Sequence, residues 1–386
     1  MTALPRPASQ RALSLPRSAI REIMVLASAT PDVIHLELGE PDFGTPPHIV
    51  ESAIQSLRDG WTRYTPNPGT MRLRELIAAR FAARLGRPIE VDRVVATTGA
   101  VGALFTAVNL VAESGDEVLI PDPGWPNYHA IVHLAGAVPV RFHQRPQDGY
   151  LPDLDEVASL IGPRTKAILY NTPGNPTGAV FPREIVAGLA ELADKHGLYL
   201  IADEVYEDIV FDGGHVSAAS FGLDDRVFLV SGASKSYAMT GFRVGYLLCP
   251  PALGPVAAIL QEPVTSHTAA VSQKAVEAAL SGPQDSVAQA RETFRRRRDI
   301  VLDVLGNTGL LPAPPAGAFY ALVNVGDRHP DSMTFAKALL TERKVATVPG
   351  ITFGPSCDKT VRIAFTTDDA ALRTGLERFR DYVEGR

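Results

Sequence analysis

Four polar residues of the sequence stand directly after apolar runs that are typical of strands, and their types suit the chemistry of a reactive amine. Asn175 lies in NTPGNPTG after KAILY, and Asp203 and Tyr206 lie in ADEVYED after LYLI. Lys235 lies in SGASKSY after VFLV. The carboxyl ends of strands in a parallel sheet face one crevice, so we expect these side chains to lie close together. A lysine in a pocket of low polarity loses its proton readily and condenses with an aldehyde, which predicts that Lys235 is the nucleophile and the general acid and base.

The rest of the chain supplies the elements that would position these residues. From about residue 94 onward, short apolar runs alternate with longer amphipathic stretches, which is the rhythm of βα units. The clearest strands are EVLIP, AVPVRF, KAILY, LYLIA, VFLV and VGYLLC, and the helix REIVAGLAELADKH is expected to end at Gly197. We therefore predict an α/β fold in which a large domain holds a mostly parallel sheet covered by helices on both faces, with a smaller α+β domain.

The length of the chain, 386 residues, indicates two domains rather than a single core. The prolines of LLPAPPAGAFYAL separate the main βα series from a shorter unit that contains TVRIAF and a final helix. We predict an N-terminal arm that also forms part of the small domain at residues 1–45. The large domain, which carries Asn175, Asp203 and Lys235, is predicted at 46–293, and the C-terminal small domain at 294–386.

Charge and composition narrow the classes of partner. The formal net charge of −6 provides no broad basic field for nucleic acid or anionic lipid, so we expect small-molecule partners and neither a nucleic acid nor a membrane. Cys249 and Cys357 are too few for a disulfide framework, which favours a reducing compartment. No segment has the apolar length of a signal peptide or a membrane span, and we expect a cytoplasmic protein.

In their order and spacing, these motifs resemble the class I and II aminotransferases, enzymes of fold type I that depend on pyridoxal 5'-phosphate (PLP) and are related to prokaryotic aspartate aminotransferases. The resemblance runs from ELGEPDFGTP to VRIAFTTDD. It implies that Lys235 carries PLP as a Schiff base and that Asp203 pairs with the pyridine nitrogen of the ring. It also implies that Asn175 and Tyr206 form hydrogen bonds with the phenolic oxygen of the cofactor.

The resemblance also predicts how the cofactor's phosphate is held. In TTGAVGALFTAV a turn opens a helix whose exposed amides can face an anion, and an arginine and a serine would add charge and a hydroxyl donor. These phosphate-binding residues are Gly99, Ala100, Val101, Ser234 and Arg243. Many relatives have a further serine where Gly232 stands here, so another donor must replace it. Tyr64 resembles the tyrosine that reaches the phosphate from the neighbouring subunit, which predicts a homodimer with shared active sites.

The substrate side of the site follows from the same resemblance. The implied substrates are an α-amino acid and a 2-oxo acid, between which the enzyme would transfer an amino group. Trp125 is expected to stack on the cofactor ring. The resemblance places Arg362 and Gly39 at the α-carboxylate of the substrate, where a guanidinium binds more specifically than an ammonium. It also implies that Trp125 and Asn175 contact the substrate.

One departure from the family concerns the substrate's side chain. At Val101 the prokaryotic aspartate enzymes have a lysine that helps to bind the distal carboxylate. Burying an unpaired carboxylate costs several kcal/mol, roughly, so the absence of that lysine predicts a neutral or apolar amino acid. His267 is an alternative basic residue that would reach the site from the partner subunit.

Other readings of the sequence remain open or less favoured. A β-eliminating lyase, such as one that cleaves cysteine S-conjugates, would use the same lysine and cofactor. A transcription regulator with this fold would need a DNA-binding domain ahead of the ELGEPDF motif, for which 36 residues give no room.

His129 and His133 have the spacing of two metal ligands but no third ligand, so we expect no metal site. We expect the basic run Arg295–Arg298 to be a solvated helix face.

Overall fold

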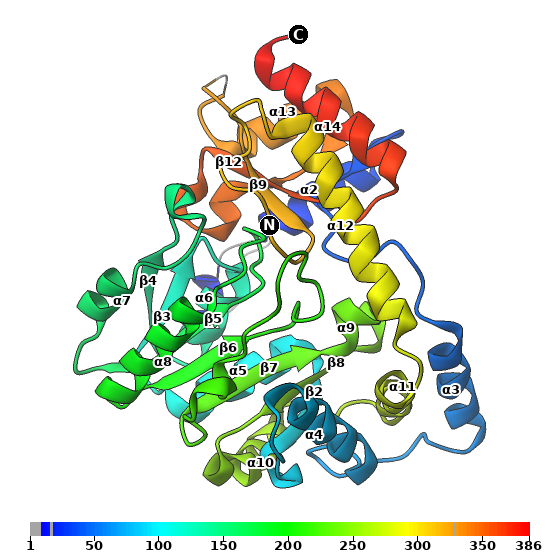
Figure 1. The fold of residues 1–386 in the computed structure, drawn as a ribbon, viewed down its shortest axis with the longest axis vertical. Coiled ribbons are helices and arrows are strands. Elements are labelled where there is room, and N and C mark those ends of the chain that lie inside the picture. Colours follow the sequence, from blue (N-terminus) through cyan, green and yellow to red (C-terminus); the bar gives the residue numbers. More distant parts are fainter. Residues whose placement is uncertain (1–8, 16–17, 328) are drawn as a thin grey trace.

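The computed structural model describes residues 9–15, 18–327 and 329–386 (Figure 1). Residues 1–8 and 16–17 of the predicted N-terminal arm lie outside the described residues. The helices are Gln10–Leu13 (α1), Ala19–Ser28 (α2), Pro47–Arg58 (α3), Met71–Leu85 (α4), Gly99–Val111 (α5), Pro126–Leu134 (α6), Leu154–Leu160 (α7), Arg183–His196 (α8), Ala233–Ser236 (α9), Gly254–Thr265 (α10), Ala270–Ser281 (α11), Asp285–Leu305 (α12), Ser332–Arg343 (α13) and Asp369–Glu384 (α14). The strands are Ile34–His35 (β1), Val94–Thr98 (β2), Glu117–Asp122 (β3), Val138–His143 (β4), Thr165–Asn171 (β5), Tyr199–Asp203 (β6), Val227–Gly232 (β7), Val244–Leu248 (β8), Tyr320–Asn324 (β9), Val345–Ala346 (β10), Val348–Pro349 (β11) and Thr360–Ala364 (β12).

A sheet with the strand order β2-β8-β7-β6-β5-β3-β4 forms the centre of the larger part of the molecule. The pairs from β4 to β7 are parallel, and β8 runs antiparallel to both β7 and β2. Each of the six strands expected from the sequence is present, so the prediction of a mostly parallel α/β sheet is confirmed. The apolar runs are continuous because helices bury both faces of these strands.

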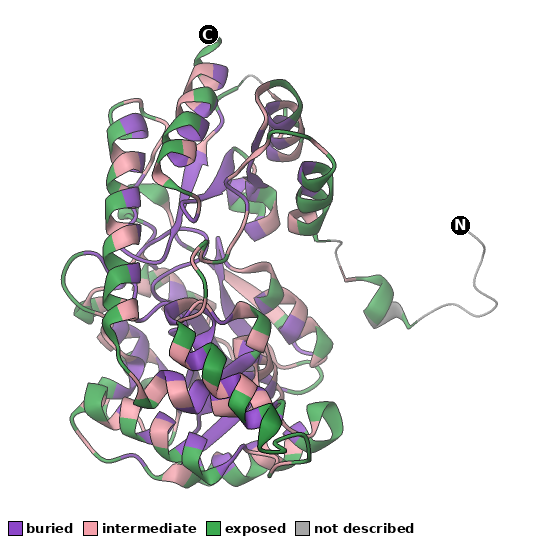
Figure 2. Ribbon diagram, turned by 90° about the vertical axis from the view of Figure 1, so that its right-hand side faces the viewer, coloured by how far each residue is buried: buried purple, intermediate pink, exposed green. Residues whose placement is uncertain are grey.

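Successive residues of the central strands point to opposite faces of the sheet, as the period of a strand requires. Ile168 and Leu200 pack in a cluster with residues of α4, α8 and α11. Their neighbours Leu169 and Ile201 pack in a second cluster with residues of α5 and α6. Figure 2 shows the strands buried between the helices that flank them. The sheet is therefore a rigid support for whatever its strand ends carry.

Helix α8 illustrates how the sequence sets the bounds of these elements. Its buried residues Val186, Leu189, Ala190 and Ala193 recur at three- and four-residue spacing, which places them on one face. The helix ends where Gly197 adopts a left-handed conformation with φ of 66°, which glycine adopts without steric cost. The predicted end of this helix at Gly197 is confirmed.

A smaller unit stands above the large sheet and contains the three-stranded antiparallel sheet β11-β12-β9 (Figure 1). Helices α12, α13 and α14 pack on it, and its apolar cluster includes Phe294, Val323 and Ile363. The N-terminal segment joins this unit, because β1 pairs in parallel with β10 and Ile23 of α2 lies in the same cluster. We propose the domain division predicted from the sequence, with α12 as an element that both units share.

Helix α12 also corrects one expectation. The run Arg295–Arg298 is not a uniformly solvated face, because Arg297 is buried and binds Asp42 in bidentate geometry. The distances are 2.8 Å from Nη1 to Oδ1 and 2.7 Å from Nη2 to Oδ2. Arg297 lies three residues after Phe294 and four before Val301, so helical spacing places it on the buried stripe. The ion pair attaches the segment around residue 42 to α12.

No helix among the described residues is long and apolar enough to cross a bilayer.

Candidate active site

A cavity of about 540 Å³ opens at the carboxyl end of the large sheet, against the smaller unit. Its walls come from three parts of the chain: the strand ends of the large sheet, the β9 and β12 strands, and the N-terminal segment that includes α2. Of the thirteen residues that the sequence singles out for the site, those that line the cavity are Gly39, Ala100, Val101, Trp125, Asn175, Asp203, Tyr206, Ser234, Lys235, Arg243 and Arg362. Gly99 lies immediately behind this wall and Tyr64 lies outside it.

Lys235 occupies α9, the short helix that follows β7. Its Nζ donates a hydrogen bond of 2.6 Å to the backbone oxygen of Gly39, which brings the N-terminal segment to the amine. Removal from water, together with the positive charge of Arg362, lowers the pKa of Lys235 to about 8. About a tenth of the amine is therefore neutral at pH 7, far more than for an ordinary lysine, and a neutral amine both condenses with an aldehyde and accepts a proton.

Asp203 is the last residue of β6 and is buried beneath the cavity. Burial raises the pKa of its carboxyl to about 6, while a hydrogen bond of 2.7 Å from the Tyr128 hydroxyl to Oδ2 opposes that rise. The other oxygen, Oδ1, accepts from the backbone N–H of Val205 at 3.2 Å. The carboxylate is held on both sides, and it becomes a strong partner for any positive charge brought into the cavity.

The start of α5 gives another part of the lining that suits an anion. Helix α5 starts at Gly99, so the backbone N–H groups of its first turn lack partners within the helix and carry the positive end of its dipole. Gly99 has φ of 70°, and a side chain there would clash with the guanidinium of Arg243. Only glycine lets this arginine lie against the start of the helix. Ser234 adds a buried hydroxyl to the same lining.

Arg362 of β12 lies fully buried between the two units. Its Nη2 donates to the backbone oxygen of Glu37 at 2.7 Å, and its Nη1 donates to Asn175 Oδ1 at 3.2 Å. Its Nε is buried without a partner among the described residues. Burial lowers the pKa of Arg362, although an arginine stays charged in proteins. A buried guanidinium without a carboxylate partner is suited to binding one from a ligand.

Tyr206 and Tyr320 connect these groups on the side of the smaller unit. Their hydroxyls lie 3.1 Å apart, and the Tyr320 hydroxyl donates to the backbone oxygen of Gly39 at 3.3 Å. The Arg362 guanidinium lies 4.5 Å from the centre of the Tyr320 ring. Burial raises the pKa of Tyr206 well above its usual value, so its hydroxyl stays protonated and able to donate.

Trp125 and Val101 form part of the apolar lining, whereas Tyr64 is not one of the lining residues. Trp125 caps α6, and its ring meets the Tyr128 ring edge-on at 5.5 Å between centroids. Tyr64 is 91% exposed, and its ring lies nearly perpendicular to the ring of His267, with 5.5 Å between the two centroids. Within one subunit, Tyr64 therefore takes no part in the cavity.

Sequence reasoning missed Tyr128 and Tyr320, which hold Asp203 and Tyr206 in place. A weak signal for Tyr128 was its position three residues after Trp125, on the first turn of a helix that starts at a strand end. It also missed the contribution of α2, from which Ile20, Arg21 and Met24 enter the lining.

These residues fit PLP on three observations of the chain itself. The open start of α5 with Arg243 suits the charge of a phosphate ester, and Asp203 suits a protonated pyridine nitrogen. The amine of Lys235 lies in the same cavity, where an aldehyde could meet it.

Comparisons with known proteins agree with this arrangement. Residues 31–379 match the model of the family described as aminotransferase class I and II. The chain is 38% identical over 351 residues to an aspartate/prephenate aminotransferase of Thermus thermophilus, covering 90% of each chain. It is 37% identical to an arginine–pyruvate transaminase of Pseudomonas aeruginosa, covering 90% of this chain and 89% of that one. The structure of Thermus thermophilus aspartate aminotransferase with maleate superposes with a TM-score of 0.93 at 37% identity, over 97% of this chain and 99% of that one.

Proposed function

The chain belongs to the class I and II aminotransferases, and we propose that it transfers the amino group of an α-amino acid with a neutral or apolar side chain to a 2-oxo acid. Like the rest of the family, it is a PLP-dependent enzyme. One observation carries this proposal: the amine of Lys235, the carboxylate of Asp203 and the guanidinium of Arg362 line the same cavity.

When bound, PLP supplies an aldehyde for the amino group and a protonated ring that takes up the charge left by the departing α-proton. We assign Lys235 the roles of holding the cofactor and moving that proton, because its lowered pKa suits both. Asp203 would accept a hydrogen bond from the ring nitrogen, with Tyr128 and the Val205 N–H holding its oxygens. Arg243 and the amides of Ala100 and Val101 would bind the phosphate, whereas the predicted Gly99 amide already donates to the Arg243 backbone oxygen at 3.0 Å.

The α-carboxylate of the substrate would lie against Arg362. Its guanidinium already donates to Asn175 and to the Glu37 backbone, so it is held in one orientation before any ligand arrives. Gly39 contributes backbone beside the same group, and a side chain there would collide with the Tyr320 hydroxyl. The substrate would thus be bound at one end whatever its side chain.

The side chain of the substrate would meet Ile20, Met24 and Val101, which give this part of the lining an apolar character. One observation favours a second class of substrate: Arg21 of α2 lines the same cavity and could receive a distal carboxylate. The alternative of a β-eliminating lyase has no such support, and the relatives named above are aminotransferases.

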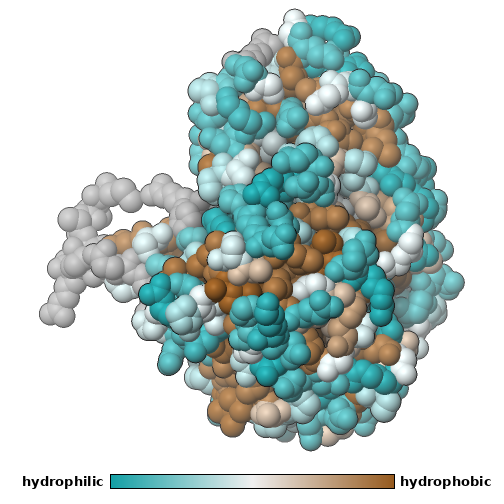
Figure 3. All heavy atoms as spheres, turned by 60° about the vertical axis from the view of Figure 1, so that its left-hand side comes forward, coloured by the Kyte–Doolittle hydropathy of each residue, from teal (hydrophilic) through white to brown (hydrophobic). Residues whose placement is uncertain are grey.

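We also propose the homodimer that Tyr64 predicts. Large hydrophobic side chains are exposed near Tyr64 in the sequence and along α10, among them Trp61, Met71, Ile259 and Val264. A second cavity of about 450 Å³ is lined mostly by apolar residues of α5, α6 and α10. Figure 3 shows hydrophobic side chains gathered on one face of the molecule. Patches of this kind typically mark protein interfaces.

We also propose a cytoplasmic location, because both cysteines are free thiols. Cys249 and Cys357 are free and buried, and burial raises the pKa of the two thiols to about 12 and about 11. They are therefore unreactive thiols rather than parts of a disulfide framework, which suits a reducing compartment.

The test is a comparison of single half-reactions with aspartate, glutamate, alanine, methionine and phenylalanine, each followed by the conversion of PLP to pyridoxamine phosphate. We expect the neutral and apolar amino acids to react faster than the two acidic ones. Arg21→Ala serves as the matched variant: if Arg21 binds a distal carboxylate, this change slows only aspartate and glutamate. A strong preference of the wild type for aspartate would overturn the substrate proposal. Release of ammonia and pyruvate from a cysteine S-conjugate, without formation of pyridoxamine phosphate, would overturn the proposal that the reaction is transamination.

A further inference from the structure

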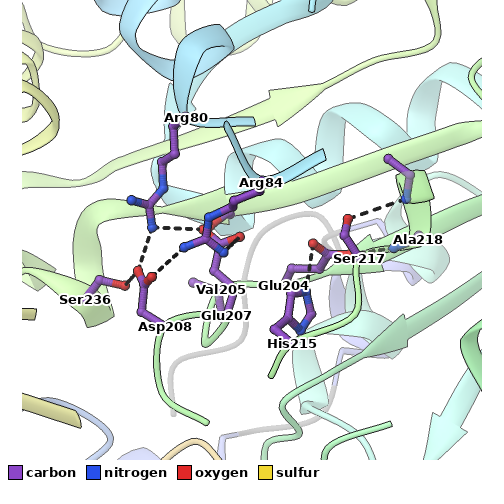
Figure 4. Close-up of polar contacts among 12 residues, drawn as sticks. Arg80, Arg84, Glu204, Val205, Glu207, Asp208, His215, Ser217, Ala218 and Ser236 are labelled. Carbon is purple, nitrogen blue, oxygen red and sulfur yellow. Dashed lines mark hydrogen bonds and ion pairs between the residues drawn. The ribbon is translucent and has the colours of Figure 1, made fainter. Parts of the chain in front are cut away.

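A network of buried charges lies next to the active-site segments and has no part in the chemistry described above (Figure 4). It joins two arginines of α4, three carboxylates from the segment that follows β6, and one histidine. Its members are Arg80, Arg84, Glu204, Glu207, Asp208 and His215. Glu204 is 1% exposed and Glu207 is 5% exposed, so these charges are withdrawn from water.

The arginines hold the segment that carries Asp203 and Tyr206. Arg80 Nη2 lies 3.2 Å from Glu207 Oε1 and 2.6 Å from Asp208 Oδ2. Arg84 repeats the pattern one helical turn later, with Nη1 at 2.7 Å from Glu207 Oε2 and Nη2 on Asp208 Oδ1. Figure 4 shows both guanidinium groups directed at these carboxylates. The two carboxylates are therefore fixed by a pair of guanidinium groups rather than by a single contact.

The same carboxylates also contact the segment that carries Lys235. The Ser231 hydroxyl donates to Glu207 Oε1 at 3.1 Å, and the Ser236 hydroxyl donates to Asp208 Oδ2 at 2.5 Å. Arg80 makes a direct contact as well, from Nη1 to the Tyr237 hydroxyl at 3.3 Å. Ser236 is the residue next to Lys235. The network thus joins the two segments that must meet at the cofactor.

His215 supplies the remaining charge. Glu207 and Asp208 pair with the two guanidinium groups, whereas Glu204 pairs with His215, whose Nε2 lies 2.9 Å from Glu204 Oε2. Burial alone would lower the pKa of His215, but the charge of Glu204 raises it overall, which favours the protonated ring. Although Glu204, Glu207 and His215 lie close enough to hold a metal ion, this reading is disfavoured. Both oxygens of Glu207 already pair with arginines, and Glu204 Oε1 accepts from the Ala218 N–H at 3.0 Å. A cation would face two guanidinium groups.

We propose that Arg80 is a positioning residue of the transamination site. It contacts Glu207 and Asp208, and Asp208 in turn contacts Ser236. These contacts set the placement of Asp203 and Tyr206 relative to Lys235. This inference rests on the roles assigned under the proposed function. A displacement of about 1 Å in a reacting group costs up to roughly a hundredfold in rate, so a link between the two segments has a direct use. A buried ion network is by itself weak evidence for a role in stability, since well-packed apolar residues often replace such pairs without loss.

The test uses two variants that weaken the link in different ways. Arg80→Lys keeps the charge but loses the fork that contacts both carboxylates and Tyr237. Ser236→Ala removes only the hydroxyl that ties Asp208 to the Lys235 segment, and the arginine pairs stay intact. Arg93→Lys is the matched control, because Arg93 is also largely withdrawn from water, with 4% of its side chain exposed against 15% for Arg80, and binds Asp224 and the Cys249 backbone. Ser332→Ala is the second control, since its hydroxyl donates to Asp358 at 2.8 Å in the smaller unit.

The first readout is amide hydrogen exchange of the protein without PLP, in peptides that cover residues 204–209 and 233–239. Loss of a hydrogen bond to a charged group should lower protection there by about tenfold in both test variants and in neither control. The second readout is the pH midpoint of the absorbance of bound PLP. It should rise by about half a pH unit in the test variants, as the donors around the ring are less well placed. The rate of the first half-reaction should fall by about tenfold, with unchanged affinity for the amino acid.

Unchanged exchange and an unchanged absorbance midpoint in both test variants would overturn the inference, and so would equal changes in the controls. If none of the amino acids converted the PLP of the wild-type protein to pyridoxamine phosphate, the proposed function would be overturned instead. The exchange experiment would still decide whether Arg80 links the two segments, because it needs neither cofactor nor activity.

Discussion

Replacing Tyr128 with phenylalanine removes one hydroxyl and tests how the charge of Asp203 is controlled. That hydroxyl donates to Asp203 Oδ2 over 2.7 Å, and the ring itself is buried and would keep its packing. The carboxylate would retain the backbone N–H of Val205 on its other oxygen. The change therefore removes one of two hydrogen bonds to a buried anion and little else.

The size of the effect follows from the strength of that hydrogen bond. A hydrogen bond to a charged group contributes about 1.5–3 kcal/mol, and about 1.4 kcal/mol corresponds to one pH unit of pKa. Burial already raises the pKa of Asp203 to about 6. Without Tyr128 we expect the pKa to rise by a further one to two pH units, roughly. Near neutral pH, much of this carboxyl would then be uncharged in the protein without PLP.

The assay is urea unfolding of the protein without PLP, at one protein concentration and at a series of pH values. A carboxyl whose pKa is raised on folding stabilises the folded state below its unfolded pKa of 3.8, and this contribution is lost as the pH rises through the folded pKa. In the wild type the loss is complete soon above pH 6. In Tyr128→Phe it should continue to about pH 8 and amount to roughly 1.5–3 kcal/mol more.

Tyr170→Phe provides the control, because Tyr170 is also fully buried and its hydroxyl has no partner in the described part of the chain. Its free energy of unfolding should follow the pH profile of the wild type. If Tyr128→Phe followed the same profile as well, the hydroxyl would not control the charge of Asp203, and the argument would be refuted.

Three further predictions concern other parts of the account. His215→Gln should destabilise the protein most at low pH, because burial alone would lower the pKa of His215 but Glu204 raises it overall. The contribution of His215 to the free energy of unfolding is therefore full below about pH 6.5 and is lost as the pH rises through the folded pKa. Urea unfolding at pH 6 and at pH 9 would reveal the difference. Asp203→Asn should retain PLP by its phosphate contacts yet lose about a hundredfold in α-proton exchange, and exchange at the wild-type rate would count against its role. Mixing inactive Tyr64→Phe and Lys235→Ala subunits should restore activity, since one site of each heterodimer is intact; no recovery after verified subunit exchange would place Tyr64 outside the partner's site.

Much of the cavity could be predicted from the sequence because its polar residues follow strands. Asn175, Asp203 and Lys235 stand at the ends of β5, β6 and β7, which are neighbours in the sheet, so their order along the chain gives their order in space. Arg362 could be placed only by its resemblance to the family, since β12 belongs to a different sheet. Its position depends on how the two units pack.

The residues that the sequence did not reveal act across long separations and resemble ordinary core residues. Tyr128 reaches Asp203 over 75 positions, and Tyr320 reaches Tyr206 over 114. A tyrosine on an apolar helix or strand gives no sign of which polar group its hydroxyl will meet. Arg80 and Arg84 were overlooked for a similar reason. Two arginines four residues apart on a helix usually face solvent, and here the carboxylates that neutralise them come from another part of the chain.

The most direct test of the central claim is to reduce the PLP-loaded protein with borohydride and to map the labelled peptide. The account predicts that the cofactor becomes attached to Lys235 in the SGASKSY segment, and that Lys235→Ala takes up no label. A label on any other lysine of the wild-type chain would contradict it.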